Sequence, residues 1–405
     1  MVGSFAWVDR AGLHWPDERS ECGAVKVERV LPTPEAAELL DLVCDVARDT
    51  LTQRAAAAER ESRFPRDAFM TLGRMGLLGL PYPEDHGGSA QPYEVYLQVV
   101  EELSRAWLTV GLGVSVHTLS CFPLARFGTD AQRARWLPGM LGGALLGAYC
   151  LSEPDSGSDA GALRTRAEST DDGYRLDGTK AWITHAGQAD FYTVMARTSD
   201  ERSRGISCFL VPAEADGVRP GPPEHKMGLR GSPTAQLELA GVRADHDQLI
   251  GGLGNGFTIA LAALDTGRLG IAACAVGLAQ AALDTALDYA GGRRQFGRPI
   301  ADFEGVGFML ADMATGIEAA RAIYLAAARR ADSGAPFTKQ AAMAKLFCTD
   351  TAMRVTADAV QVLGGYGYVE DYPVERYLRE AKALQIVEGT NQVQRLVISR
   401  QLRRE

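Results

Sequence analysis

The stretch Leu384-Gln-Ile-Val-Glu-Gly-Thr-Asn-Gln-Val-Gln-Arg395 places one carboxylate, Glu388, at the end of a mostly apolar run. A glycine follows, and then Thr390, which is a suitable N-cap for a last helix running towards Arg403. Glu388 is therefore expected in a strand-like or loop segment between helices, among apolar neighbours. Desolvation raises the pKa of such a carboxylate and lets it accept a proton. On these residues alone, a solvated glutamate beside a helix is the more ordinary interpretation.

Length and composition limit the classes of protein to consider. A chain of 405 residues suggests two or three domains, and 46% hydrophobic with 23% charged residues is typical of a soluble globular protein. The net charge of −9 argues against binding to a nucleic-acid backbone as the main activity. The longest uncharged apolar stretch, 269–283, is too short to cross a bilayer, so no membrane span is predicted.

Cysteine and histidine usage bears on compartment and metal binding. The seven cysteines are scattered and never form a CxxC pair, which fits reduced thiols in a cytoplasmic protein. The six histidines include no HxxxH or HExxH arrangement, so no metal site is predicted. Residues 1–10 show no apolar signal region, so secretion is not expected and the predicted location is cytoplasmic.

Hydrophobic patterning predicts a multidomain α+β protein. Residues 1–32 lack periodicity and are predicted to form an extension that is packed on the surface or partly disordered. The rest of the chain is divided into an N-terminal helical domain, a middle β domain of sandwich or barrel-like form and a C-terminal four-helix bundle, at 33–148, 149–250 and 251–405. Two helical domains are thus expected to flank one β domain.

Individual elements follow from the same patterns. The alternating stretch 174–184 is predicted to turn at Asp177-Gly178 and form a hairpin. Residues 94–110 are predicted to form one long helix. Broadly apolar helices, which must be buried on several sides, are predicted over 257–290, 305–332 and 339–363.

Several turn-rich stretches carry residues that suit a cofactor, each with a plainer interpretation beside it. Tyr149–Asp159 offers hydroxyls and backbone N–H groups that could grip a planar heterocycle or a phosphate, although such clusters are usually ordinary loops. Trp182 could line a cofactor, but a tryptophan in a strand is more often core. The arginines of Gly291–Pro299 form either a pyrophosphate clamp or a basic helix C-terminus. Gln361–Tyr368 could bring backbone close to a ligand or cap a helix.

Six motifs in one order and spacing resemble the acyl-CoA dehydrogenase family, over about 33–402. They are Leu151-Ser-Glu-Pro-Asp-Ser-Gly-Ser-Asp159, Lys180-Ala-Trp-Ile-Thr184, Lys226-Met-Gly-Leu-Arg-Gly-Ser232, Arg293-Arg-Gln-Phe-Gly297, Gln361-Val-Leu-Gly-Gly-Tyr-Gly367 and Val387-Glu-Gly-Thr-Asn-Gln392. The resemblance implies FAD bound between the middle β domain and the C-terminal bundle. The family's order of helical, β and helical domains agrees with the patterns above.

The resemblance also implies which residues contact ligands. The flavin ring and ribityl chain would contact Tyr149, Leu151, Ser152, Gly157, Ser158, Trp182, Ile183 and Thr184. The flavin diphosphate would be held by Thr390 and Gln392 of the same subunit. The adenosine diphosphate half of a neighbouring subunit's FAD would be reached by Arg293, Gln295, Phe296, Gln361, Leu363, Gly364 and Gly365. Acyl-CoA would contact Ser158, Asp265, Arg268 and Gly389. These contacts imply at least a dimer, and the usual assembly is a dimer of dimers.

By the same resemblance, Glu388 is the catalytic base. It would remove the α-proton of an acyl-CoA thioester while the β-hydrogen leaves as hydride to the flavin, which gives the trans-2-enoyl-CoA. An acceptor such as an electron-transfer flavoprotein would reoxidise the flavin. Some relatives carry the base on the helix that holds Asp265, but Gly267 offers no carboxylate here. The chain departs from the family at Asp155-Ser156, where Gly-Ala or Gly-Asn is commoner, and at Val387, where many members have a larger residue.

Other activities remain open at this point. The acyl group could be attached to a carrier protein in a biosynthetic pathway rather than to CoA. A flavin-bearing relative that binds DNA in a stress response is disfavoured by the acidic charge and the lack of a basic tail. Nitroalkane oxidation is disfavoured by the intact Glu388 context. The stretch Leu264–Ile271 resembles the short-chain and branched-chain members, but no motif fixes the acyl chain length.

Overall fold

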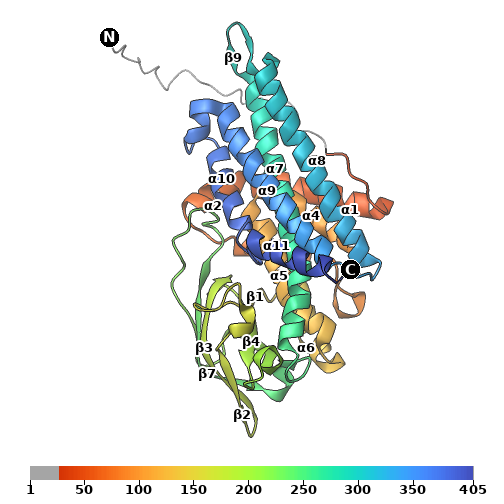
Figure 1. The fold of residues 1–405 in the computed structure, drawn as a ribbon, viewed down its shortest axis with the longest axis vertical. Helices are drawn as coiled ribbons and strands as arrows, with labels where there is room; N and C mark the ends of the chain where they lie inside the picture. The colour runs from red at the N-terminus through yellow and green to blue at the C-terminus, as the bar shows by residue number, and fades with distance from the viewer. Residues whose placement is uncertain (1–26, 405) are drawn as a thin grey trace, which may run out of the picture.

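The computed structural model describes residues 27–404, so most of the predicted extension 1–32 lies outside the described residues. Figure 1 shows helices above a β-sheet, with the helix α7 (Gly256–Gly292) running from the sheet to the far end of the helical part. Because α7 contacts helices of both helical parts and also strand β5 (Ile206–Pro212), it is the element that connects the parts of the chain.

The N-terminal part is helical, as predicted. Its helices are α1 (Pro34–Val46), α2 (Gln53–Arg60), α3 (Arg66–Arg74), α4 (Tyr93–Ala106), α5 (Leu108–Phe127) and α6 (Asp130–Leu141), with a π-helical turn at Ala47–Thr52. The prediction of one helix over 94–110 is wrong, because Trp107 adopts an extended backbone (φ −160°, ψ 106°) and separates α4 from α5. The Trp107 indole donates a hydrogen bond of 2.8 Å to buried Glu59, and this tertiary contact favours the break.

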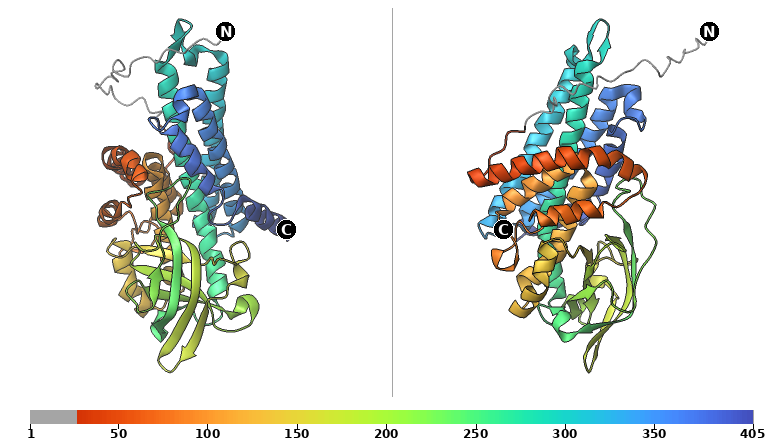
Figure 2. Two further views of the ribbon diagram at one scale, coloured as in Figure 1. Left: turned by 90° about the vertical axis from the view of Figure 1, so that its left-hand side faces the viewer. Right: turned by 180° about the vertical axis from the view of Figure 1, so that it is seen from behind.

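The middle part is one curved sheet of eight strands. They are β1 (Gly147–Cys150), β2 (Arg166–Thr170), β3 (Gly173–Thr184), β4 (Phe191–Arg197), β5 (Ile206–Pro212), β6 (Val218–Pro220), β7 (Thr234–Asp245) and β8 (Leu249–Ile250). Their order is β6-β7-β3-β2-β4-β5-β8, and β1 pairs parallel to β4. Figure 2 shows this sheet below the helices, next to the N-terminal end of α7.

The predicted hairpin at Asp177-Gly178 is wrong. Strand β3 continues through these residues, and its antiparallel ladder with β7 absorbs the irregularity as a register shift between Leu176 and Asp177. A Cβ on Gly178 would lie 2.6 Å from the Thr165 hydroxyl, so the glycine serves a close approach rather than a turn. The turn comes earlier, between the paired residues Thr170 and Gly173 of β2 and β3.

The C-terminal part is a bundle of long helices close to the predicted bounds. It contains α7, α8 (Glu304–Asp332), α9 (Thr338–Leu363), α10 (Val374–Leu384) and α11 (Asn391–Leu402), and a small hairpin of β9 (Arg294–Gln295) and β10 (Arg298–Pro299) joins α7 to α8. Helices α5 and α7 are long and apolar enough to cross a membrane by length and composition alone. In the described part of the chain, however, 89% and 72% of these apolar stretches are buried against other elements.

Three hydrophobic clusters make up the core of the part of the chain that the structure describes. One cluster spans the N-terminal and C-terminal helices, and a second consists of buried side chains of the middle, β part. The third joins α5 and α6 to β4, β5 and the first turns of α7. The first turns of α7 therefore lie where the sheet meets the helices, and this junction is where the candidate site is built.

Candidate active site

Glu388 lies in a tight turn between α10 and α11, as the loop alternative predicts. Its φ is +54° and that of Gly389 is +88°, so two consecutive residues adopt the left-handed conformation. For a residue with a Cβ this conformation costs about 1–2 kcal/mol, and such strain persists only where surrounding structure imposes it. The Gln394 side-chain amide donates to Gly389 O (2.7 Å) and Glu388 O (3.3 Å), while Thr390 caps α11 through the Val393 N–H.

The carboxylate of Glu388 is pressed against α7. A Cβ on Gly267 would lie 3.1 Å from Glu388 Oε2 and 3.3 Å from a methyl carbon of Leu119, so only glycine leaves this space free. Oε2 is inaccessible to solvent and has no hydrogen-bond partner among the described residues. Burial raises the pKa of Glu388 to about 7, and the positive charges of Arg268 and Lys345 oppose that rise. The carboxylate can therefore both hold and release a proton near neutral pH.

Arg268 is the first of the two cations. It lies one turn along α7 from Asp265, whose Oδ1 accepts a hydrogen bond of 2.5 Å from its guanidinium. The other Asp265 oxygen accepts from the hydroxyl of Thr338, at the start of α9. Arg268 is 4% exposed, and its Nε has no partner within residues 27–404. One guanidinium N–H thus remains unused at the site.

Lys345 is the second cation and comes from the middle of α9. Its side chain is fully buried, and its ammonium donates to Gly389 O (3.0 Å) and to Asn391 Oδ1 (2.8 Å). Burial lowers the pKa of Lys345 to about 7, against the favourable charges of Glu388 and Asp350. Asn391 is itself fixed, because its amide donates to the Thr349 hydroxyl (2.9 Å) and to Asp350 (2.7 Å).

A buried ion pair shapes the loop 151–158. The Lys180 ammonium, which is fully buried, donates to Glu153 (2.8 Å) and to Leu151 O (3.2 Å). Glu153 also accepts from the backbone N–H groups of residues 164–165 at 2.6 and 2.9 Å. The loop is therefore anchored at one end, whereas Gly157 and Ser158 face solvent and a Cβ on Gly157 would meet nothing within 4 Å.

Trp182 is not a core residue, so the plainer interpretation of it is wrong. It sits in an irregular segment of β3 with φ +62°, and 66% of it is exposed, whereas its neighbour Ile183 is buried and Thr184 is half-buried. Tyr149, on β1, carries a buried hydroxyl without a partner among the described residues. Burial raises the pKa of Tyr149 well above its usual range, and the charges of Cys208 and Glu388 add to the rise. The Tyr149 hydroxyl on the sheet and the Glu388 carboxylate are therefore near enough to interact electrostatically.

A second group of predicted residues lies far from Glu388. The tip of the β9–β10 hairpin stands at the end of the bundle opposite the sheet (Figure 1), and Phe296 at this tip is 93% exposed with φ +51°. The Arg293 guanidinium lies 5.7 Å from the ring centroid of Tyr366, which follows the end of α9. The group as a whole comprises Arg293, Gln295, Phe296, Gln361, Leu363, Gly364 and Gly365, all exposed except the buried Leu363. Within one chain these residues do not join the site around Glu388.

The residues at the two departures from the family's pattern each have a defined contact in the structure. Asp155 is exposed and pairs with Arg164 at 3.4 Å, so its extra charge faces solvent. Ser156 is buried and its hydroxyl donates to Asp159 O at 2.7 Å, which holds the loop. Val387 is half-buried and packs against the large helical core.

Sequence reasoning missed Lys345 and Gln394, which hold the turn of Glu388. The available signal for Lys345 was a lysine in the middle of a broadly apolar helix, a position where a charge needs a specific partner. Gln394 offered no comparable signal, because a glutamine in the first turns of a helix is ordinary.

Comparisons with known protein families identify the same three parts of the chain, in the same order. Models of the acyl-CoA dehydrogenase N-terminal, middle and C-terminal domains match residues 33–144, 148–242 and 254–403. An acyl-CoA dehydrogenase of Bacillus subtilis (strain 168) is 45% identical over 372 residues, which is 91% of this chain and 98% of that protein.

Solved structures of other proteins share this fold over most of the chain. The three-dimensional structure of butyryl-CoA dehydrogenase from Megasphaera elsdenii superimposes with a TM-score of 0.90 at 38% identity, covering 93% of this chain and 100% of that one. The prolyl acyl carrier protein oxidase AnaB superimposes with a TM-score of 0.88 at 27% identity, covering 91% of this chain and 99% of that one.

Proposed function

This chain belongs to the acyl-CoA dehydrogenase family, whose members are FAD-dependent oxidoreductases, and we propose that it converts an acyl-CoA thioester to its trans-2-enoyl-CoA. The observation that carries the proposal is the Glu388 carboxylate, which is packed on Gly267, left without a hydrogen bond at Oε2 and brought to a pKa of about 7. A base with a pKa near the working pH suits abstraction of a weakly acidic proton.

The proposed reaction breaks two C–H bonds and forms one C=C bond. Glu388 takes the α-proton, and bound FAD supplies the acceptor for the hydride that leaves the β-carbon. No hydrogen bond from the backbone N–H of Glu388 is found within residues 27–404, so this group is free to donate to the thioester carbonyl. That hydrogen bond would stabilise the negative charge that develops on the carbonyl oxygen. Arg268, Asp265, Ser158 and Gly389 would contact the acyl-CoA.

The residues of the sheet fit a flavin. Trp182 is held outside the core by a backbone conformation that tryptophan rarely adopts, and the buried hydroxyl of Tyr149 lacks a partner, so both are prepared for a ligand. We assign flavin contacts to the whole set predicted from the sequence, namely Tyr149, Leu151, Ser152, Gly157, Ser158, Trp182, Ile183 and Thr184. Thr390 and the exposed Gln392, at the start of α11, would hold the diphosphate.

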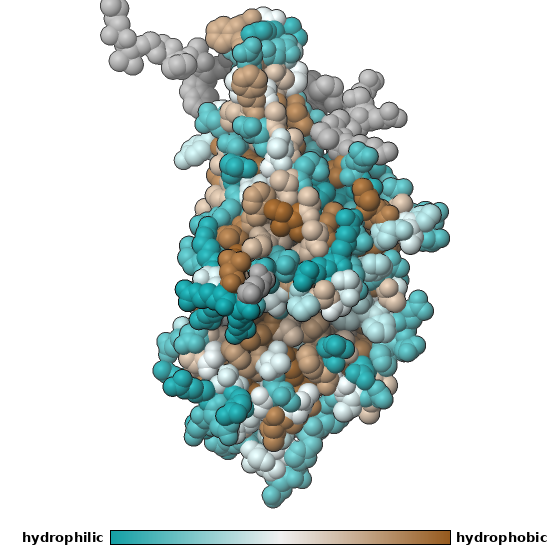
Figure 3. Space-filling view, turned by 45° about the vertical axis from the view of Figure 1, so that its right-hand side comes forward, coloured by the Kyte–Doolittle hydropathy of each residue, from teal (hydrophilic) through white to brown (hydrophobic). Residues whose placement is uncertain are grey.

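The distant group supports a homo-oligomer. Arg293, Phe296 and Gln361 cannot serve the site of their own chain, so we propose that they reach the FAD of a neighbouring subunit in a dimer, or in a dimer of dimers. Figure 3 shows apolar side chains gathered midway along the helical part, on the face turned towards the viewer. Among the large hydrophobic side chains, Met343 and Phe347 on α9 and Leu402 on α11 are 37%, 39% and 55% exposed. A monomer that retains FAD would contradict this assembly.

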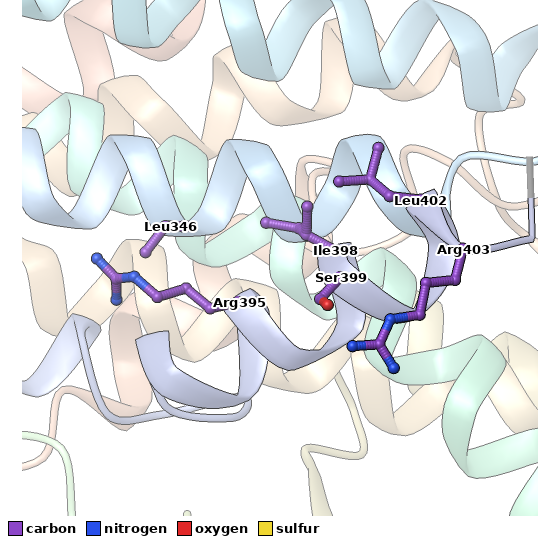
Figure 4. A pocket seen from close by; sticks show the side chains of 6 residues that line it. All are labelled: Leu346, Arg395, Ile398, Ser399, Leu402 and Arg403. Atoms are coloured by element: carbon purple, nitrogen blue, oxygen red, sulfur yellow. The ribbon is translucent and has the colours of Figure 1, made fainter.

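A groove between α9 and α11 adds to this apolar face. Figure 4 shows its lining, which consists of Leu346, Arg395, Ile398, Ser399, Leu402 and Arg403. None of these six described residues is a carboxylate, so the groove suits contact with another subunit better than chemistry. The acceptor that reoxidises the flavin is proposed to be an electron-transfer flavoprotein, and the six described cysteines, all free, suit the proposed cytoplasmic location.

A carrier-protein thioester is the second candidate substrate. It is favoured by one observation, the similarity over 91% of the chain to a prolyl acyl carrier protein oxidase. The base and the flavin contacts would be the same, because the two substrates share the reacting thioester. A panel of butyryl-CoA, isobutyryl-CoA and the corresponding carrier-protein thioesters, added anaerobically while FAD absorbance is followed, separates the two.

Replacing Glu388 by Gln tests the function directly. The amide has nearly the same shape but cannot accept the proton, so we expect bound FAD at the wild-type level and turnover lower by roughly three or more orders of magnitude. Anaerobic bleaching of FAD by the best thioester measures the reaction apart from reoxidation. Turnover near the wild-type value in this variant would refute Glu388 as the base.

A further inference from the structure

We propose that Lys345 is a positioning residue that holds the turn carrying Glu388 in its reactive conformation and favours the ionised form of its carboxylate. The inference deepens the proposed function and rests on the role of Glu388 as the base. Lys345 lies on α9, 43 residues before Glu388 in the sequence, and among the predicted ligand contacts it hydrogen-bonds to Gly389.

The contacts of Lys345 straddle the turn. Its ammonium reaches Gly389 O at 3.0 Å on one side of Thr390 and Asn391 Oδ1 at 2.8 Å on the other. Gly389 O also accepts from the Gln394 amide at 2.7 Å, so one carbonyl is clamped from two helices. Because Glu388 has a positive φ, which glycine tolerates but a residue with a Cβ does not, the turn is strained at Glu388, and these hydrogen bonds oppose its relaxation.

The charge of Lys345 is available to Glu388. Of the two cations near that carboxylate, Arg268 is paired at 2.5 Å with Asp265. The ammonium of Lys345 instead donates to a backbone carbonyl and to a side-chain amide, both uncharged. Asp350 also faces Lys345, but its oxygens are engaged by the Asn391 and Gln385 amides and by Arg395. The buried ammonium therefore acts chiefly on Glu388.

The charged groups around the pair fix the sign of the effect. Glu388 faces Arg268 on α7, Lys345 on α9 and the hydroxyl of Tyr149 on β1. Lys345 faces Glu388, Asp350 and Arg268. Removing the ammonium leaves desolvation less opposed, so the pKa of Glu388 rises and the active, ionised form requires a higher pH. A lysine that only filled the space between α9 and α11 would leave this pH dependence unchanged.

Two substitutions separate the two effects. Lys345→Met removes both the charge and the donors, whereas Lys345→Gln removes the charge but can still donate to Gly389 O. In both variants we expect the acid limb of kcat/KM to move to higher pH by about one unit. At the pH plateau, kcat should fall about 10- to 100-fold in the Met variant and less in the Gln variant, because misplacement of a reacting group by a fraction of an ångström carries such losses.

Lys382→Met is the matched control. Lys382 is exposed on α10, and its ammonium donates to Gln385 Oε1 at 3.0 Å, so this variant removes the same charge close to the turn without touching it. We expect its pH profile to match that of the wild type. An equal shift in this control would mean that net charge alone moves the profile and would overturn the proposal.

Glu388→Gln, measured in parallel, separates failure of the inference from failure of the function. If Glu388→Gln is inactive and the profile of Lys345→Met superimposes on the wild-type profile, Lys345 has no positioning role and the proposed function stands. If Glu388→Gln is active, the proposed function itself fails. If neither Lys345 variant retains FAD, as measured by its absorbance per chain, the residue serves folding rather than positioning, which also overturns the inference.

Discussion

Gly267→Ala should separate stability from activity. The new Cβ would lie 3.1 Å from Glu388 Oε2, 3.4 Å from its carboxyl carbon and 3.3 Å from the methyl carbon of Leu119. These distances are a few tenths of an ångström inside ordinary contact, so the carboxylate must move away from α7. In a helix interior, Ala is favoured over Gly by up to about 1 kcal/mol, which offsets part of the contact strain. We therefore expect a melting temperature within a few degrees of the wild-type value.

Activity should respond much more strongly. The displaced carboxylate no longer meets the α-carbon at the distance that proton transfer needs, and we expect kcat to fall by about 10- to 100-fold with unchanged FAD content. Steady-state turnover, flavin absorbance per chain and thermal unfolding measure the three quantities. Gly305→Ala is the control, because Gly305 is helical and a Cβ there meets nothing within 4 Å. Wild-type kcat in Gly267→Ala would refute the tight packing of Glu388 on α7.

Two further predictions concern the β-sheet and its junction with the helices. Burial lowers the pKa of His185 to about 4, below its unfolded value near 6.5, so its contribution to stability is complete above about pH 6.5 and is lost as the pH falls towards 4. Urea unfolding at pH 7 and pH 5 should show that His185→Gln loses less stability on acidification, by up to about 2 kcal/mol, and an unchanged difference would contradict the assignment. Trp182→Gly should relieve a positive φ, which costs about 1–2 kcal/mol, yet weaken FAD binding at least several-fold by equilibrium dialysis. Unchanged FAD affinity would remove Trp182 from the flavin site.

The sequence predicts helices better than it predicts where they are interrupted. The long helices α7, α8 and α9 lie within a few residues of their predicted bounds, because long apolar runs bounded by Gly and Pro leave few alternatives. The two errors in predicted secondary structure, at Trp107 and at Asp177-Gly178, have the same kind of cause. In each case a partner distant in sequence decides the local conformation, Glu59 for the first and strand β7 for the second.

The same distinction applies to the site. The turn of Glu388 and the cap at Thr390 are local, and the sequence is enough to predict them. The contact with Gly267 and the clamp by Lys345 depend on how α7 and α9 pack against the turn, over separations of 121 and 44 residues. Trp182 shows the reverse case, since alternation in a strand suggests a core side chain and only the irregular pairing of β3 with β7 turns the indole outward.

The basicity of Glu388 results from a balance that substrate can shift. Burial raises its pKa, whereas the positive charges of Arg268 and Lys345 lower it. The residue is still only half-buried in the chain alone, so a thioester placed beside it would remove further water. Arg268 is held by Asp265 and Lys345 by the turn, so we expect a bound thioester to strengthen desolvation more than it changes the opposing charges. On this argument the carboxylate is a stronger base in the complex than in the free protein, and it gains that strength only when a proton is there to be taken.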